Sequence, residues 1–311
     1  MTRIFFATDL HGSEVCWRKF LNAATFYGAD VLICGGDLTG KAIVPIVEAG
    51  GGYEYVLSGT RRHVASADLA AAEAQIQRRG YYPVRMSAAQ VVELQADPER
   101  VRGLFTEQMC LTVERWLRLA DERLAGTGVR CLVCPGNDDE TAIDDVVRAA
   151  ARVELAEGRV IDVDGFEMIS TGWSNPTPWH TYREEPEADL GVRIEDMTRQ
   201  LRDPHQAIFN LHVPPYGSKL DEAPALDDQL RPLHGGRAMR PVGSTAVRAA
   251  IARHQPLLSL HGHIHESRGA SKLGRTLAIN PGSSYEEGLL MSAIVELDPR
   301  KGIKNYQLVS G

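Results

Sequence analysis

Five short apolar runs, each followed closely by aspartate, asparagine or histidine, place the strongest constraint on how this chain folds. The runs and the polar side chains after them are 3–7 with Asp9 and His11, 31–34 with Asp37, 129–134 with Asn137, 207–211 with His212, and 256–260 with His263 and His265. Apolar runs of this length are typical of buried strands in a parallel sheet. Since open α/β sheets place their sites at the carboxyl ends of such strands, we expect the seven side chains to meet there.

Most of these motifs have a second interpretation when taken alone. Asp37 follows two glycines and is also typical of a turn. The Gly-Asn-Asp-Asp sequence at 136–139 could cap a helix over 143–147. His212 precedes two prolines and could be a structural histidine. The Gly-His-Ile-His sequence at 262–265 is the most informative motif, because two imidazoles so close together in a glycine-containing loop have few structural explanations.

Taken together, the motifs occur in an order that resembles the calcineurin-like metallophosphoesterase family. The resemblance runs from Asp9 to the Asn-Pro-Gly-Ser sequence at 280–283 and so covers nearly the whole chain. It implies an α/β fold, a four-layer α/β/β/α sandwich of two mixed sheets flanked by helices. It also implies a metal-dependent phosphoric ester hydrolase, and two adjacent divalent ions do need oxygen and imidazole donors with a carboxylate to bridge them.

The resemblance further implies a dinuclear metal site. Seven side chains would hold the two ions: Asp9, His11, Asp37 and His265 for the first, and the bridging Asp37 with Asn137, His212 and His263 for the second. A hydroxide that bridges the metals would attack phosphorus at neutral pH. Mn, Fe, Zn or Co would each suit this mixture of oxygen and imidazole donors.

One residue departs from the family pattern. The resemblance implies a histidine directly after the asparagine ligand, where it stabilises the phosphate and protonates the leaving oxygen, but Asp138 occupies that place. A carboxylate repels phosphate unless it is protonated, turned away or paired with a cation. Loss of a general acid matters most for poor leaving groups. We therefore expect a phosphodiesterase rather than a strong monoesterase, with Asp138 in the catalytic site; the alternative is a catalytically weak binding module of the same fold.

Other side chains could compensate for the missing acid. His261 could lie at the edge of the metal site and take part in catalysis, or it could make a structural hydrogen bond. His180 and His234 lie in segments expected to be irregular and could supply a proton from a loop. Arg237 and Arg240 could clamp a phosphate or could be solvated loop charges.

The domain organisation follows from the spread of the motifs. Because the donors must meet in one site, we expect one domain over 1–311. A hairpin is expected over 42–57, and a helical insertion is expected over 67–126, where apolar residues roughly follow a helical period. As a cap, this insertion could shape a substrate cleft or form an oligomer contact; it could equally be a packing appendage.

Composition narrows the class of partner. The net charge of −7 and the isoelectric point near 5.8 argue against a broad nucleic-acid surface and a nuclease, so a small phosphate ester is the expected partner. With no signal peptide and no apolar stretch long enough to cross a membrane, the expected location is the cytoplasm. Five cysteines suggest reduced thiols; Cys131 and Cys134 could form a redox or zinc pair, but the apolar strand pattern around them favours buried structural thiols.

Overall fold

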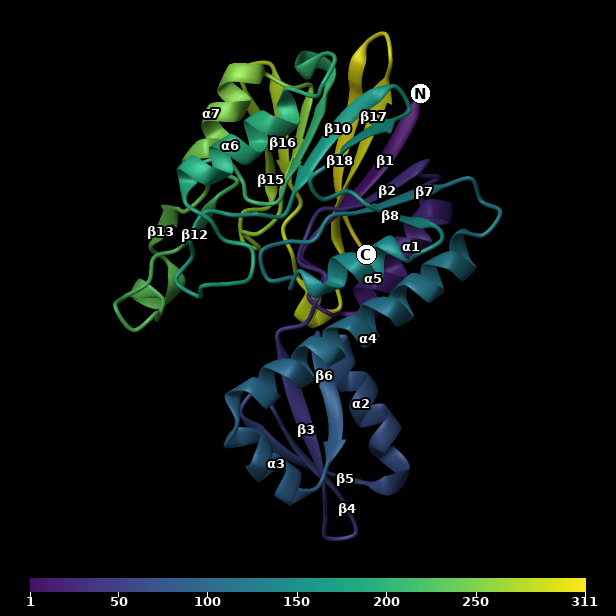
Figure 1. The fold of residues 1–311 in the computed structure, drawn as a ribbon, viewed down its shortest axis with the longest axis vertical. Coiled ribbons are helices and arrows are strands. Elements are labelled where there is room, and N and C mark those ends of the chain that lie inside the picture. The colour runs from purple at the N-terminus through teal and green to yellow at the C-terminus, as the bar shows by residue number, and fades with distance from the viewer.

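Two six-stranded mixed sheets form the centre of the computed structural model, which describes residues 1–311 (Figure 1). The first sheet has the order β18-β17-β1-β2-β7-β8 and the second the order β15-β16-β14-β11-β10-β9. The strands of the first are β1 (Thr2–Ala7), β2 (Val31–Cys34), β7 (Arg130–Val133), β8 (Val153–Leu155), β17 (Met291–Asp298) and β18 (Gly302–Ser310). Those of the second are β9 (Val160–Val163), β10 (Phe166–Thr171), β11 (Ile208–Leu211), β14 (Leu258–Leu260), β15 (Gly269–Leu273) and β16 (Thr276–Asn280).

Both sheets bury both faces, which explains why their central strands are continuously apolar. Strands β1, β2, β7 and β8 are parallel, as are β10, β11, β14 and β16. A cluster of 19 buried residues, among them Ile4, Phe6 and Met168, fills the space between the sheets. Helices α1 (Glu14–Phe26), α4 (Pro98–Leu124) and α5 (Ala142–Arg148) cover the first sheet, and α6 (Glu187–Thr198) and α7 (Thr245–His254) cover the second. The predicted four-layer sandwich is therefore confirmed.

A small α/β unit projects from the sandwich (Figure 1). Its four-stranded sheet has the order β5-β4-β3-β6, with its own buried cluster around Val44, Ile46 and Tyr55. Its elements are β3 (Ala42–Ala49), β4 (Gly52–Leu57), β5 (Thr60–Ala65), α2 (Leu69–Arg78), β6 (Tyr81–Met86) and α3 (Ala88–Gln95). The expected hairpin over 42–57 is present as β3 and β4.

The helical insertion expected over 67–126 needs correction on two points. The projecting unit begins with β3, and strand β6 interrupts its helices. Pro83 argues against a strand at β6 in the sequence, because proline is excluded from central strands. In the structure β6 lies at the edge of its sheet, where proline is tolerated. At the other end, α4 leaves the unit, starting at the Asp97 cap, whose carboxylate accepts from the amides of Glu99 and Arg100.

Helix α4 docks on the sandwich through tryptophan. The rings of Trp17 in α1 and Trp116 in α4 stack with centroids 5.1 Å apart and planes 6° from parallel. The indole nitrogen of Trp17 donates to the Trp116 carbonyl, and that of Trp116 donates to Glu14 Oε2. Since both rings are 1% exposed and their polar atoms are satisfied, this contact fixes the path by which the chain returns from the projecting unit.

The remaining elements and the cysteines can now be placed. A short hairpin of β12 (Glu222–Pro224) and β13 (Met239–Pro241) extends beside the second sheet. All five cysteines are free, and Cys131 and Cys134 are buried, as expected for structural thiols. None of the helices combines the length and the apolar character needed to cross a bilayer.

We predict that Trp116→Ala lowers the free energy of unfolding by about 3–5 kcal/mol, because it removes a buried ring from the contact between α4 and α1. Leu111→Ala, on the face of α4 where the side chain is 46% exposed, should change it by only about 0.5 kcal/mol. Equilibrium urea unfolding measures both. Equal losses in the two variants would contradict the docking role of Trp116.

Candidate functional site

The side chains predicted to bind metal come together at one edge of the sandwich, at the carboxyl ends of strands from both sheets. β1 leads to Asp9 and His11, β2 to Asp37, and β7 to Asn137. From the second sheet, β11 leads to His212, and β14 leads to His263 and His265. The backbone is left-handed at four of these residues, with φ values of 54° at Asp9, 41° at His11, 49° at Asp37 and 65° at His263. Such conformations are uncommon for residues other than glycine and cluster at functional sites.

The donors form two groups that meet at Asp37. One group is Asp9, His11 and His265, and the other is Asp37, His212 and His263; within each group the donor atoms lie within 4.8 Å of one another. His11 and Asp37 form a third group of this kind with Asp138. Asp37 Oδ2 lies 3.5 Å from His11 Nε2 and 3.4 Å from His212 Nε2. This carboxylate therefore contacts both groups, which is the position that a bridging ligand requires.

Asn137 joins the second group through its side-chain oxygen. Oδ1 lies 2.6 Å from His263 Nδ1 and 3.1 Å from His212 Nε2. The amide nitrogen points the other way and donates to Thr181 Oγ1 at 2.8 Å. Thr181 thus fixes which atom of the amide faces the imidazoles. Sequence reasoning missed this residue, which is 44 positions from Asn137 and belongs to no motif.

Glycines in the motifs permit this close packing. A Cβ on Gly136 would lie 2.1 Å from Asp37 Oδ1, and one on Gly262 would lie 2.3 Å from Asp9 Oδ2. Neither distance is sterically possible. The glycine before Asn137 and the glycine before His263 are therefore required by the approach of one motif to another.

The electrostatics of the cluster reflect its buried carboxylates. Burial would raise the pKa of Asp9, but its hydrogen bond with His265 and the nearby His212 lower it to about 2. Burial would lower the pKa of His212, but Asp37 and Asp9 raise it to about 9. Burial and His212 lower the pKa of His263 to about 4. At neutral pH the Asp9 carboxylate is therefore ionised and is stabilised by nearby positive charge, whereas the His263 imidazole is neutral.

The donor set fits divalent metal ions. The Nε2 atoms of His11 and His265 face each other at 3.1 Å, and Asp9 Oδ1 lies 3.4 Å from His265 Nε2. The Nε2 atom of His11 also lies 3.5 Å from Asp37 Oδ2, so this nitrogen faces both carboxylates and the second imidazole. Converging imidazole nitrogens and carboxylate oxygens are the ligands of first-row divalent metals.

Asp138, the residue that departs from the family pattern, is paired with a cation. Its Oδ2 lies 3.1 Å from Lys41 Nζ and 3.8 Å from His11 Nδ1. Burial and Asp37 raise the pKa of Asp138 to about 6, while Lys41 opposes this shift. Burial would lower the pKa of Lys41, but Asp138 and Asp37 raise it, so its ammonium stays charged. Lys41 was not singled out in the sequence, although it follows Asp37 by four positions in the same loop.

The catalytic role expected of His261 needs correction. His261 is fully buried, and its Nδ1 donates to the carbonyls of Leu211 and Val213 at 2.7 and 3.1 Å. Its Nε2 lies 2.8 Å from Ser259 Oγ, which donates to it. Burial lowers the pKa of His261 to about 4. With both ring nitrogens engaged, His261 is a structural histidine, which was the alternative left open by the sequence.

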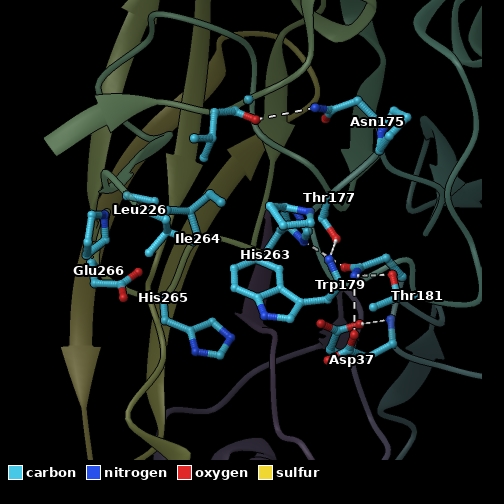
Figure 2. A pocket seen from close by; sticks show the side chains of 18 of the residues that line it. Asp37, Asn175, Thr177, Trp179, Thr181, Leu226, His263, Ile264, His265 and Glu266 are labelled. Atoms are coloured by element: carbon cyan, nitrogen blue, oxygen red, sulfur yellow. Dashed lines mark hydrogen bonds between the residues drawn. The ribbon is translucent and has the colours of Figure 1, made fainter. Parts of the chain in front are cut away.

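A cleft opens beside the donor groups (Figure 2). Asp37, Lys41, Asn137 and Asp138 belong to its lining. Arg240 also lines it, but three other residues considered as compensating groups do not: His180, His234 and Arg237. The only histidines that line the cleft are therefore the predicted ligands His263 and His265, and no other histidine there could act as the general acid that Asp138 replaces.

Comparison with known proteins supports the fold. No family model matches the sequence. The uncharacterized protein MJ1162 of Methanocaldococcus jannaschii is 28% identical over 154 residues, a stretch that covers 48% of this chain and 62% of that protein. The chain thus matches less than two thirds of the length of this curated relative.

Solved structures match over the whole chain. The protein TT1561 of Thermus thermophilus has a TM-score of 0.52 at 15% identity, over 100% of this chain and 98% of that one. Another crystal structure has a TM-score of 0.57 at 15% identity, over 99% and 98% of the two chains. At these identities the likeness shows the fold alone. Further matches are named as an archaeal phosphodiesterase, a 5′-nucleotidase precursor and a phosphoesterase, but their TM-scores of 0.41 or less are too low to support an argument. In the order of its motifs along the sequence and in its sandwich fold, this chain is similar to the calcineurin-like metallophosphoesterases.

Proposed function

We propose that this protein is a metal-dependent phosphoesterase that hydrolyses phosphodiesters in preference to phosphomonoesters. The observation that carries the proposal is the pair of donor groups that meet at Asp37 and border an open cleft. A cluster of ionised carboxylates and imidazoles of this kind has no structural necessity in the core of a sandwich, since buried charges are costly unless they are paired or bind metal.

The chain's residues would hold two divalent ions. The ligands would be Asp9, His11, Asp37 and His265 for one ion, and Asp37, Asn137, His212 and His263 for the other. When bound, two such ions lower the pKa of water and offset negative charge on the phosphoryl oxygens. Mn, Fe, Zn and Co remain compatible with the mixed donors.

Asp138 and Lys41 set the preference for diesters. A phosphate that enters the cleft meets the carboxylate of Asp138, which the Lys41 ammonium offsets at 3.1 Å. A diester carries one negative charge and a monoester nearly two at neutral pH, so the residual repulsion by Asp138 is smaller for a diester. Without a histidine acid, the site also favours substrates whose leaving group departs without a proton.

Two other functions are less well supported. A binding module of this fold is favoured by Asp138 in place of the acid, but it leaves the full set of metal-type donors unexplained. A nuclease needs a cationic channel for the nucleic-acid backbone. Lys41 and Arg240 are the only lysine and arginine in the cleft lining, which favours a small substrate.

We predict that metal-stripped protein reloaded with Mn hydrolyses bis(p-nitrophenyl) phosphate faster than p-nitrophenyl phosphate. Asp37→Asn should reduce both rates by at least about a hundredfold, because even the outer partners of metal ligands contribute ten- to a hundredfold. Asp145→Asn, the same chemical change at an exposed residue of α5, serves as the control.

Asp138→His should raise hydrolysis of an alkyl monoester such as ethyl phosphate by about tenfold or more relative to the diester, because it restores a proton donor beside a poor leaving oxygen. The ratio of the two kcat/KM values, measured in wild type and variant, tests this directly. Stoichiometric Mn binding without turnover of either ester would favour the binding module, and a wild-type preference for the monoester would contradict the role given to Asp138.

We predict that Lys41→Met lowers kcat/KM for the diester by about tenfold or more, because it leaves the Asp138 carboxylate unpaired where the phosphate binds. Lys301→Met, in a surface turn, is the matched control. Adding Asp138→Asn to Lys41→Met should recover most of the loss. Failure of this rescue would mean that Lys41 acts on the substrate directly rather than through Asp138.

We predict that Thr181→Val weakens Mn binding about ten- to a hundredfold, because Asn137 loses the hydroxyl that orients its amide. Titration calorimetry on stripped protein measures the affinity, and Thr60→Val on the exposed strand β5 is the control. Unchanged Mn affinity in Thr181→Val would show that the Asn137 amide needs no such partner.

A further inference from the structure

The cleft beside the donor groups is much larger than a phosphate requires. Its volume is about 1070 Å³, enough for a ligand with a substantial organic group. Beyond the donors its wall is formed mainly by the loop 175–182 and the segment 223–243. Apolar and aromatic side chains such as Pro176, Trp179 and Tyr182 face the space from the loop.

Trp179 is the most exposed large hydrophobic residue of this wall. It is 64% exposed, whereas Trp17 and Trp116 are 1% exposed in the core. Trp173 packs beneath the Arg193 guanidinium, 4.4 Å from the ring centroid. Trp179 has neither an aromatic nor a cationic partner in the structure, and Figure 2 shows its indole among the side chains that line the pocket. An exposed indole beside a binding cleft offers a flat face that is available for stacking.

The loop that carries Trp179 is held by one carboxylate. Glu184 accepts hydrogen bonds from the backbone amides of Thr177 and Thr181 at 3.0 and 2.9 Å, and from both of their hydroxyls. The amide of Trp179 donates to Thr177 Oγ1 at 3.2 Å. The indole is therefore presented by an ordered loop, so that binding to it costs little additional ordering.

The same loop is tied to the metal-type donors. The Thr181 hydroxyl, which donates to Glu184, accepts from the amide of Asn137. Trp179 therefore stands two residues from a direct contact with the donor groups, at a fixed position relative to the place where a phosphate would bind. A ligand with its phosphorus at the donors can reach the indole with a group attached through one ester oxygen.

The charges of the cleft limit the rest of the ligand. Its lysine and arginine side chains are Lys41 and Arg240, and Lys41 is already paired with Asp138. Glu187 and Glu266 add negative charge to the lining. A ligand with several phosphates would meet too few cations, so the cleft suits a molecule with a single phosphate and an uncharged organic group.

We propose that the substrate is a phosphodiester with one phosphate and a flat aromatic group that stacks on Trp179. The inference rests on the proposed function and names the substrate class for the same site. The contact makes Trp179 a residue that determines specificity. Nucleobases and aryl esters share the chemistry that it would recognise.

The test is binding of two phosphinates that cannot be hydrolysed. Benzyl(methyl)phosphinate and cyclohexylmethyl(methyl)phosphinate carry the same single charge, have CH2 in place of the ester oxygen, and differ in whether the ring is flat. Calorimetry on Mn-loaded wild type should show that the benzyl compound binds about fivefold or more tightly, the lower range for aromatic stacking. Trp179→Ala should abolish this preference and Trp179→Phe should keep most of it. Tyr216→Ala, on another exposed aromatic of the cleft, should leave it unchanged.

Equal binding of the two phosphinates by wild type, or a preference that survives Trp179→Ala, would overturn the inference even if the protein hydrolyses diesters. A preference that depends on Trp179 in a protein without turnover would support the inference and reject the proposed activity. The source of the aromatic group follows from kcat/KM for methyl phenyl phosphate and for the methyl ester of thymidine 5′-phosphate. If Trp179→Ala lowers kcat/KM more for methyl phenyl phosphate, the aromatic group is an aryl ester. If it lowers kcat/KM more for the thymidine ester, the group is a nucleobase.

Discussion

The position of the donor groups depends on the buried carboxylate of Asp139. It accepts hydrogen bonds from the backbone amides of Gly136, Leu38 and Thr39 at 2.7, 3.0 and 2.8 Å. Burial and Asp37 raise the pKa of Asp139, and the amides of Gly136 and Leu38 with the Thr39 hydroxyl oppose that shift by stabilising its charged form. The loops after β2 and β7 cannot separate without leaving a buried carboxylate unpaired, which costs several kcal/mol. One side chain thereby holds together the second and third motifs.

Most of the site could be predicted because its donors directly follow apolar strands. Strand ends in a parallel sheet share one edge, so the position of Asp37 or His212 after its run already places it there. The partners of these donors could not be predicted in the same way. Thr181 reaches Asn137 only through tertiary folding, and Lys41 reaches its partner Asp138 in the same way, although Lys41 lies close to Asp37 in the sequence. The carbonyls that engage His261 lie on and just after β11.

The fold shows the same division between local and tertiary information. Helices α2, α3 and α4 lie within the ranges where the sequence has a helical pattern, because that pattern reflects which side chains each helix buries. The assignment of α4 to the insertion was wrong because docking depends on Trp17, which is distant in sequence. Strand β6 was missed because Pro83 is compatible with a strand only at the edge of a sheet, and sequence alone does not show which strand lies at an edge.

The loop between β10 and α6 both supports the donor Asn137 and carries Trp179 on the cleft wall. Arg183 is 1% exposed, pairs with Asp144 at 2.6 Å and donates from its backbone amide to the Asn137 carbonyl. Together with Thr181, it fixes Asn137 from both the side chain and the backbone. The segment that presents Trp179 therefore also supports a metal-type donor, and a change in the length of this loop would disturb the donor groups as well as the cleft wall. Substitution of exposed side chains such as Trp179, which leaves these anchors intact, is the change that can alter specificity alone.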